Sequence, residues 1–376
     1  MILTLAFRNL FHDRVRLAVT LIGILFSIVL VAVQLGLYLG SSRMITSNID
    51  NARGELWITA FGAKSFEDGG LLLHSAERHQ ALAAAGVAEV IPLVVSFAEW
   101  RRPNGGSTRV VVVGTDPEDG GLVPWSLTDG TWLDVKSPDG IAVDKSYLAE
   151  LDVKGIGDTA QVAHGRVRIK ALTEGVRSFT QAPYAYMPIS RARHLLGAPG
   201  DATSFYLVKL QPGADVESVR RDLKSRFESA EVLTAEEFRD RSLNTWLFQT
   251  GAGVALIGGA LLGLLVGTVI VAQTLYSSTK DHLAEFATLR ALGSSSGYIH
   301  KVILGQAGLS AVIGYVLGMI IALAVVYASR GTPLPMVMTP WLAAALFAVT
   351  IFMCAISQLS AIFKVTKIDP AMVFSK

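Results

Sequence analysis

The sequence is short of cysteine and of charged residues. Cys354 is the only cysteine among 376 residues, so no disulfide can form within the chain and no metal site can rest on two thiolates. Only 17% of the residues are charged while 51% are hydrophobic, whereas soluble domains carry about 25% charged residues. The shortage of charge indicates a chain that lies partly in lipid.

Sequence motifs for several kinds of chemistry are also missing. No Gly-x4-Gly-Lys-Ser/Thr sequence is present, which excludes a P-loop ATP site, and there is no Gly-x-Ser-x-Gly nucleophile elbow. No His-Glu-x-x-His occurs, and His74 and His79 would point about 140° apart on a helix, which favours solvated surface over a metal pair. We expect no catalytic or metal site, no bound cofactor and no nucleic-acid partner.

Four hydrophobic runs are each long enough to span a membrane, which takes about 20 mostly apolar residues. None has a charged residue well inside it, so the proton or ion path that intramembrane charges would mark is not expected. The first run is too long for the core of a signal peptide, and no Ala-x-Ala-like site follows it. We predict uncleaved transmembrane helices at 17–41, 247–275, 302–328 and 341–363.

The distribution of charge predicts the orientation in the membrane. Residues 42–246 carry 23 Lys and Arg against 27 Asp and Glu, whereas the rest of the chain carries 10 against 4. Because Lys and Arg bias short loops toward the cytoplasm, we place segments 1–16, 276–301 and 364–376 inside. Residues 42–246 and the short loop 329–340 are then outside. The basic residues beside the inner helix ends are Arg8, Arg14, Arg16, Lys280, Arg290, Lys301, Lys364, Lys367 and Lys376.

Residues 42–246 have the composition of a globular domain, and we predict an α+β fold inserted between two membrane helices. The polar run Ala235–Ser242 is expected to continue into the second span as a stalk. Expected strands are 56–59, 93–100, 108–114, 159–163, 166–172, 204–210 and 231–234, and expected helices are 75–85, 190–196 and 215–227.

The first 16 residues form an amphipathic segment. Leu3, Phe7, Leu10 and Phe11 share one helical face. Two interpretations remain open: a helix lying along the inner membrane surface, or a cytosolic extension of the first span.

Glycines recur at intervals of four residues in two of the predicted spans. They are Gly259, Gly263 and Gly267 in the second span, and Gly314 and Gly318 in the third. Small residues at this spacing let helix backbones approach closely in lipid. We predict helix-packing surfaces, within one chain or between two copies; the alternative is that glycine is simply common in membrane helices.

The inner segment 280–293 is charged and rich in helix formers, yet it carries an apolar stripe of Leu283, Phe286, Leu289 and Leu292. A simple connecting loop would need neither the helix nor the stripe. The stripe either packs on the chain's own helix ends or binds a cytosolic partner. Because the chain has no energy source of its own, we favour a partner that supplies energy from inside.

This segment also carries a resemblance to a known family. Glu285-Phe-Ala-Thr-Leu-Arg-Ala-Leu-Gly293 resembles the cytoplasmic motif of FtsX/MacB/LolC-type permeases of ABC transporters, with Phe286 in place of the usual isoleucine. Lys367-Ile-Asp-Pro-Ala371 is similar to the family's C-terminal signature, and Gly155-Ile-Gly-Asp-Thr159 to a segment of the MacB-type periplasmic core. The order of one span, a large domain and three spans matches over the whole chain.

Further segments resemble the DevC-like permeases. They are Arg8-Asn-Leu-Phe-His-Asp-Arg-Val-Arg-Leu17, Leu56-Trp-Ile58 and Arg177-Ser-Phe-Thr-Gln-Ala-Pro-Tyr184. The resemblance implies a bacterial inner-membrane permease with both termini cytoplasmic, and a MacB-like periplasmic core domain.

The resemblance also implies partners and site residues. A separate cytosolic ABC ATPase, which binds ATP and Mg, would grip the stripe and Gly293, with Glu285 and Arg290 fixing orientation. Two permease copies would pair in the lipid and work with a periplasmic adaptor and an outer-membrane channel. The cargo would be amphipathic or lipid-like, and its contact residues are unknown. The alternative is an FtsX-like signalling permease that activates a cell-wall hydrolase.

Overall fold

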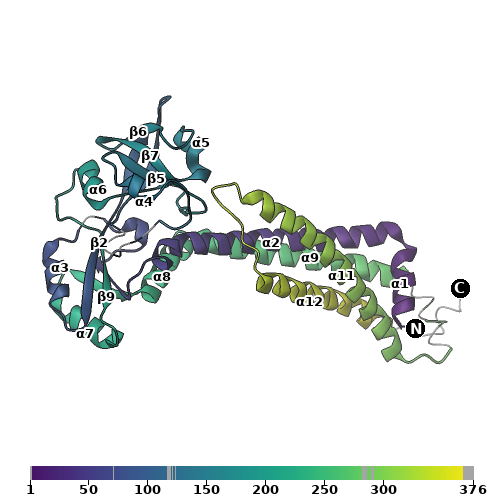
Figure 1. Ribbon diagram of the computed structural model, residues 1–376. Helices are drawn as coiled ribbons and strands as arrows, with labels where there is room; N and C mark the ends of the chain where they lie inside the picture. Colours follow the sequence, from purple (N-terminus) through teal and green to yellow (C-terminus); the bar gives the residue numbers. More distant parts are fainter. Residues whose placement is uncertain are drawn as a thin grey trace. The chain divides into compact units, whose positions relative to one another are not determined.

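The computed structural model describes residues 2–70, 72–116, 120, 122, 124–281, 285, 287–288 and 292–366. The chain divides into two compact units, each described below by itself (Figure 1). The helical unit comprises residues 1–39, 254–330 and 335–376, and the sheet unit comprises residues 40–253 and 331–334.

The helical unit is built mainly from long apolar helices that lie side by side (Figure 1). Segments of α2, α9, α11 and α12 are each long and apolar enough to cross a membrane. The short helix α1 precedes them, and Asp13 separates it from α2 by accepting a hydrogen bond from the Arg16 amide at 3.1 Å, as an N-cap does. The helices are α1 Ile2–His12, α2 Arg14–Asp50, α9 Ala252–Asp281, α11 Ser296–Ser329 and α12 Pro340–Thr366.

The helices extend beyond the predicted membrane spans. Hydropathy detects only the part of a helix that suits lipid, whereas backbone hydrogen bonding continues into polar residues. Thus α2 runs on to Asp50, where the predicted span ended at 41, because Ile45 and Ile49 are buried in the sheet unit. Likewise α9 continues to Asp281 and α11 begins at Ser296.

The structure divides the stretch in which the sequence predicted a stalk that continues into the second span. Helix α8 (Ala235–Leu243) passes into a π-helical segment, η4 (Asn244–Gln249), and α9 begins only at Ala252. Gly251 turns the chain with a φ of +80°, a conformation that glycine adopts without steric cost. Leu247, taken for the first residue of the span, is instead buried in the sheet unit.

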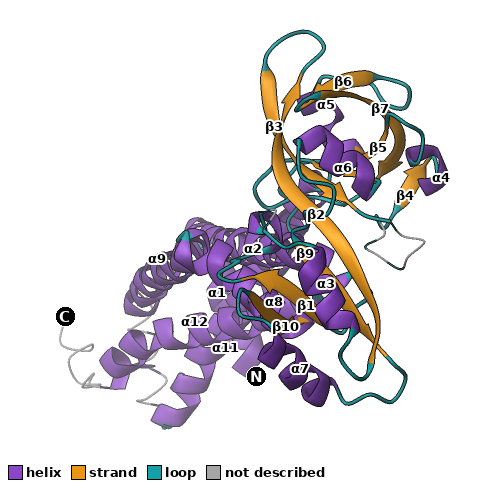
Figure 2. Ribbon diagram, turned by 90° about the vertical axis from the view of Figure 1, so that its left-hand side faces the viewer, coloured by secondary structure: helices purple, strands orange, loops and turns teal. Residues whose placement is uncertain are grey.

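The sheet unit contains one mixed sheet with helices packed on it, as the predicted α+β insert requires. The long strand β2 joins two halves: its first part pairs with β9 and its second part pairs with β3 (Figure 2). The order is β10-β1-β9-β2-β3-β8-β5-β7-β4, with β6 pairing β2 and β7. The strands are β1 Leu56–Ala60, β2 Val87–Arg101, β3 Ser107–Gly114, β4 Leu127–Asp129, β5 Gly140–Asp144, β6 Thr159–Val162, β7 Gly165–Thr173, β8 Tyr184–Met187, β9 Phe205–Leu210 and β10 Ala230–Thr234.

Aromatic side chains fill the core beside β1 and β9. Trp57 lies 5.8 Å from Phe205 and 5.1 Å from Phe238, measured between ring centroids. Phe66 stacks on Phe205 at 5.7 Å, and all four rings are buried. Such rings supply large buried apolar areas, and they pack α8 and the segment before α3 against the sheet. The remaining helices of the unit are η1 Phe66–Asp68, α3 Ser75–Leu82, α4 Trp132–Val135, η3 Lys145–Tyr147, α5 Leu148–Leu151, α6 Ile189–Leu196 and α7 Val216–Arg226.

Candidate functional site

The apolar stripe of the predicted coupling segment (280–293) lies mostly outside the described residues. Leu283, Phe286, Leu289 and Arg290 fall there, as does the 367–371 signature. The described neighbours Glu285, Ala287 and Thr288 are helical; Glu285 and Thr288 are exposed, whereas Ala287 is buried. The segment therefore has a helical part with both a packed and an exposed side.

The end of the coupling segment is well described. The side chain of Leu292 is 80% exposed, and Gly293 adopts a φ of +94°, the left-handed region in which helices commonly end. Two residues later the Ser295 hydroxyl accepts a hydrogen bond from the Tyr298 amide at 3.3 Å and caps α11. An exposed leucine thus stands beside a sharp turn at the start of the third long helix.

Contacts within the helical unit tie this end of the bundle together. The Arg16 guanidinium pairs with the Asp281 carboxylate at 2.5 Å, joining the start of α2 to the end of α9. On α1, Ala6 is fully buried in a cluster with Ile299 and Val302 of α11. A movement of the coupling segment would therefore also displace α1 and α2.

The predicted common face of α1 is partly described. Phe7 and Phe11 are half-exposed and their ring centroids lie 4.3 Å apart. The side chain of Leu3 lies outside the described residues. An aromatic pair beside a buried Ala6 gives α1 one packed side and one apolar outer side.

The glycines singled out in α9 all face α2. A Cβ built on Gly259, Gly263 or Gly267 would lie 2.6 Å from Gln34, 2.8 Å from Leu30 and 2.4 Å from Ser27, respectively. The Ser27 hydroxyl also donates a 3.0 Å hydrogen bond to the Gly263 carbonyl.

The glycines of α11 face α2 as well. A Cβ at Gly314 would lie 2.5 Å from Ile24, and one at Gly318 would lie 3.1 Å from Ile28. Of the two arrangements left open by the sequence, these described contacts are within one chain.

A buried carboxylate that the sequence did not suggest lies in the sheet unit. Glu67 in η1 is 5% exposed, and its oxygens accept hydrogen bonds from the hydroxyls of Tyr184 at 2.5 Å, Ser178 at 2.7 Å and Thr180 at 2.7 Å. These four residues are called the Glu67 cluster below. One carboxylate thereby holds both β8 and the segment that precedes it.

Burial sets the protonation behaviour of the cluster. Loss of solvation raises the pKa of Glu67 above its ordinary value, although the three hydroxyl donors oppose the shift. Burial also raises the pKa values of Tyr184 and Tyr186 well above their ordinary value. The tyrosines therefore stay neutral donors at every physiological pH.

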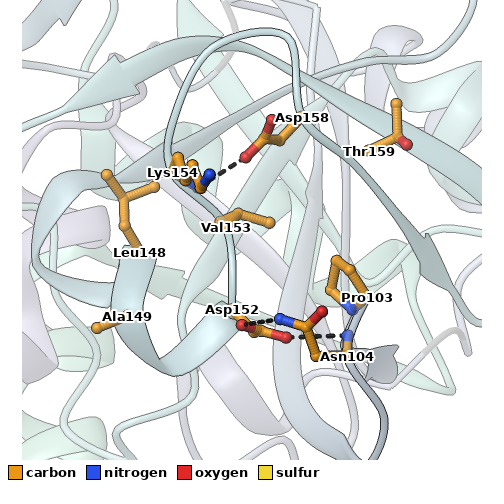
Figure 3. A pocket seen from close by; sticks show the side chains of 9 residues that line it. All are labelled: Pro103, Asn104, Leu148, Ala149, Asp152, Val153, Lys154, Asp158 and Thr159. Atoms are coloured by element: carbon orange, nitrogen blue, oxygen red, sulfur yellow. Dashed lines mark hydrogen bonds between the residues drawn. The ribbon is translucent and has the colours of Figure 1, made fainter.

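The Gly155–Thr159 segment borders a surface cavity of about 420 Å³ (Figure 3). Asp158 accepts a hydrogen bond from the Lys154 amide at 2.7 Å, and Asp152 accepts two from Asn104. Asp152 thus fastens the loop at Asn104 to its own loop, whereas Asp158 closes the turn that contains it. Within the cavity lining they form no arrangement of nucleophile and base.

The histidine pair considered in the sequence is a surface feature. His74 precedes α3, and its ring lies 3.6 Å from Asp201. His79 lies in the last turn of the same helix.

These features define a class of protein before they define a family. The described part of the chain contains four helices of spanning length, and a folded sheet unit follows the first of them in the sequence, as in a multi-pass membrane protein. A family model described as the MacB-like periplasmic core domain matches residues 17–226, more than half of the chain, and one described as the FtsX-like permease C-terminal matches residues 257–370. The chain belongs to the MacB/FtsX family of ABC transporter permeases. The family named from the resemblance in the sequence is thus confirmed.

Individual relatives are distant. An uncharacterised ABC transporter permease of Methanocaldococcus jannaschii is 22% identical over 208 residues, which are 53% of this chain and 51% of that protein. The chain therefore matches about half the length of this curated relative.

Two solved structures are similar to part of the chain. The periplasmic region of MacB from Actinobacillus actinomycetemcomitans is 16% identical with a TM-score of 0.38, covering 52% of this chain and 96% of that one. The extracellular domain of the transporter YknZ from Gram-positive bacteria is 14% identical with a TM-score of 0.35, covering 48% of this chain and 99% of that one.

Proposed function

We propose that this chain is the permease subunit of an ABC-type export complex, in which a separate cytosolic ATPase drives movement of the sheet unit. The observation that carries the proposal is the coupling segment: a charged connection between two membrane helices that is helical at Glu285, Ala287 and Thr288, with Leu292 exposed beside the Gly293 turn. Leu283, Phe286 and Leu289 complete the apolar surface for the ATPase. ATP and Mg bind to that partner.

The proposed mechanism is mechanical. ATP-driven closure of two ATPases moves the coupling segments of two permease copies. To switch such a two-state assembly nearly completely, ATP must favour one state by about 5.5 kcal/mol. Helix α2 is one continuous element from Arg14 to Asp50, with residues in both units, so it supports transmission through the backbone.

The proposed orientation follows the basic residues at the helix ends. Both termini and the coupling segment lie in the cytoplasm, and the sheet unit lies in the periplasm of a bacterium whose inner membrane holds the chain. Cysteine substitution at Leu292 in a Cys354→Ser background tests this placement. A membrane-impermeant thiol reagent should label Leu292→Cys only in inside-out vesicles.

The glycine contacts also limit how two copies can pair. Because Gly263 and Gly314 are covered by α2 within the chain, we propose that pairing uses other faces. The outward face of α9, with Leu261, Leu262 and Leu265 all about 60% exposed, is available within the described residues.

The proposed cargo is amphipathic or lipid-like, delivered through a periplasmic adaptor and an outer-membrane channel. Similarity of 8–17, 56–58 and 177–184 to the DevC-like permeases supports this choice.

A second candidate is a signalling permease that activates a cell-wall hydrolase. The large sheet unit favours export, because signalling permeases of the family usually carry a smaller outer domain.

Co-purification tests the proposal. The full chain is tagged, expressed from its own genome and isolated from membranes, and the bound proteins and lipids are identified by mass spectrometry. We expect an ABC ATPase, an adaptor and an enriched lipid. A hydrolase without an adaptor would favour signalling, and ATP hydrolysis by the chain alone would contradict both.

A further inference from the structure

At two of the places where the chain passes between the helical unit and the sheet unit, a helical segment belongs to the sheet unit. The first is the end of α2, residues 40–50, called the α2 tether; the second is residues 235–253, called the α8–η4 tether. Asp50 of the first accepts a hydrogen bond from the guanidinium of Arg239 of the second at 2.9 Å. Ile49 and Phe238 are buried in one apolar cluster. Within the sheet unit, the two tethers are therefore fastened to each other.

Both tethers also contact one short stretch, residues 178–186, which contains most of the Glu67 cluster. Asn48 of the α2 tether accepts a 2.7 Å hydrogen bond from the hydroxyl of Tyr186. On the other side, the ring of Phe179 lies 5.9 Å from the ring of Trp246 in η4. The carboxylate of Glu67 accepts hydrogen bonds from Ser178, Thr180 and Tyr184 of the same stretch.

The stretch leads directly into the sheet. Its strand β8 pairs in parallel with β3, from Val111–Tyr184 to Gly114–Met187, and Ala142 of β5 pairs with Tyr186. β3 in turn pairs with the second part of β2. A displacement of residues 178–186 would therefore move β8 and the strands paired with it. The tethers attach to β1 and β10, which lie at the other end of the strand order.

If residue 67 only stabilised the fold, an apolar side chain would serve as well as the glutamate. A carboxylate removed from water loses solvation, and an apolar side chain of similar volume often stabilises a core at least as well. No ion pair with Glu67 is present among the described residues. Three directional hydrogen bonds fix the position of the atoms that make them, whereas apolar packing does not.

We infer that Glu67 is a positioning residue, which sets residues 178–186 between the two tethers so that their movement is passed to β8. This inference rests on the proposed function, because it names where within the sheet unit the proposed motion is transmitted. The role belongs to Glu67 together with Tyr184, Phe179 and Asn48. It assigns no cargo contact to any of them.

The first arm of the test needs no ATPase. The full chain is placed in lipid nanodiscs, and backbone hydrogen exchange is followed by mass spectrometry in residues 44–50 and 244–249. Glu67→Gln and Tyr184→Phe should each raise exchange in both segments about tenfold, as expected when a buried hydrogen bond is lost. Phe179→Ala should raise exchange in 244–249 alone, since its described contact is to Trp246.

The matched control is Thr108→Val. Thr108 donates a 3.1 Å hydrogen bond to Glu150, away from both tethers in the same unit, so its loss should leave the two segments unchanged. The positioning role of Glu67 is overturned if Glu67→Gln and Tyr184→Phe leave exchange in either segment unchanged. It is also overturned if Thr108→Val raises exchange in both segments as much as those two variants do. This result would not touch the proposed function.

The second arm uses the complex with its ATPase. Spin labels at Ser107→Cys in the two permease copies, in a Cys354→Ser background, report the distance between their two β3 strands, which changes only if movement of the tethers reaches β3. We expect a change of that distance with ATP in the otherwise native chain, and none in Glu67→Gln, while ATP hydrolysis continues in both. A variant that keeps the change overturns the positioning role. If the native complex shows no change, the proposed function fails as well, whatever the exchange data give.

Discussion

The two units of this permease achieve close packing in opposite ways. In the helical unit, missing side chains bring helices together: Gly267 of α9 touches Ser27 of α2 so closely that a single added carbon would lie 2.4 Å from it. In the sheet unit, large rings do the packing, with Trp57 at its centre. The difference follows from the surroundings, because burial of rings away from water stabilises a fold, whereas between helices in lipid only contact and hydrogen bonding remain.

The largest effect should come from filling the helix contact. Gly267→Leu places a side chain where Ser27 already lies, so we expect almost complete loss of folded chain, measured as monodisperse protein after extraction in mild detergent. Gly258→Leu is the matched control, since a Cβ there meets nothing within 4 Å. Equal yields of the two variants would show that the glycine contact with α2 is not required.

A large but smaller effect is expected from emptying the aromatic core. Trp57→Ala should destabilise the sheet unit by about 3–5 kcal/mol, as removal of a buried large ring does. Chemical denaturation followed by tryptophan fluorescence measures it. Phe61→Ala, four residues along and 76% exposed, should change little, and a comparable loss there would contradict the assignment of the core.

A moderate effect is expected from pH at Glu67. Its pKa is raised in the folded chain above the ordinary value of 4.5, so as the pH rises Glu67 loses its proton first in the unfolded chain. The stability of the folded state should therefore fall until the pH passes the folded-state pKa. Glu67→Gln cannot titrate, so the difference in melting temperature between native chain and variant should shrink or reverse with rising pH.

The tyrosines facing Glu67 stay neutral over this range and add no slope. Thermal melts in nanodiscs between pH 4 and 8 provide the measurement. Parallel pH profiles for the two chains would show that Glu67 is not desolvated in the folded state.

The smallest effect should come from the ion pair between α2 and α9. Arg16 and Asp281 are partly exposed, at 25% and 54% of their side chains, and such pairs contribute about 0–1 kcal/mol. Arg16→Gln should therefore change the melting temperature slightly, and the change should vanish at 1 M salt. A loss as large as that of Gly267→Leu would mean that charge, rather than glycine packing, holds the helical unit together.

The sequence predicted the helices and strands whose formation depends mainly on neighbouring residues in the chain. Apolar runs marked the membrane helices, and the predicted strands 93–100 and 108–114 correspond to the second part of β2 and to β3. Strands β5 (Gly140–Asp144) and β8 (Tyr184–Met187) were missed, because each is short and exists only through neighbours distant in the chain. The π-helical break before Gly251 was missed because residues 244–249 have ordinary helical composition.

The candidate sites divide in the same way. The glycine positions were visible as a repeat of four residues, but their partner α2 was not. Glu67 gave no signal, because its partners Ser178 and Tyr184 follow more than a hundred residues later. The apolar stripe stays a prediction, because Phe286 and Leu289 lie outside the described residues.

The central claim is that the apolar side of residues 280–293 binds the ATPase. Its most direct test is the double substitution Phe286→Asp with Leu289→Asp, with Thr288→Asp as the charged control on the exposed side. Permease-bound ATPase is measured after purification from membranes. The account predicts that the double variant folds normally and loses the ATPase while the control retains it; an ATPase that stays bound and active on the double variant would contradict it.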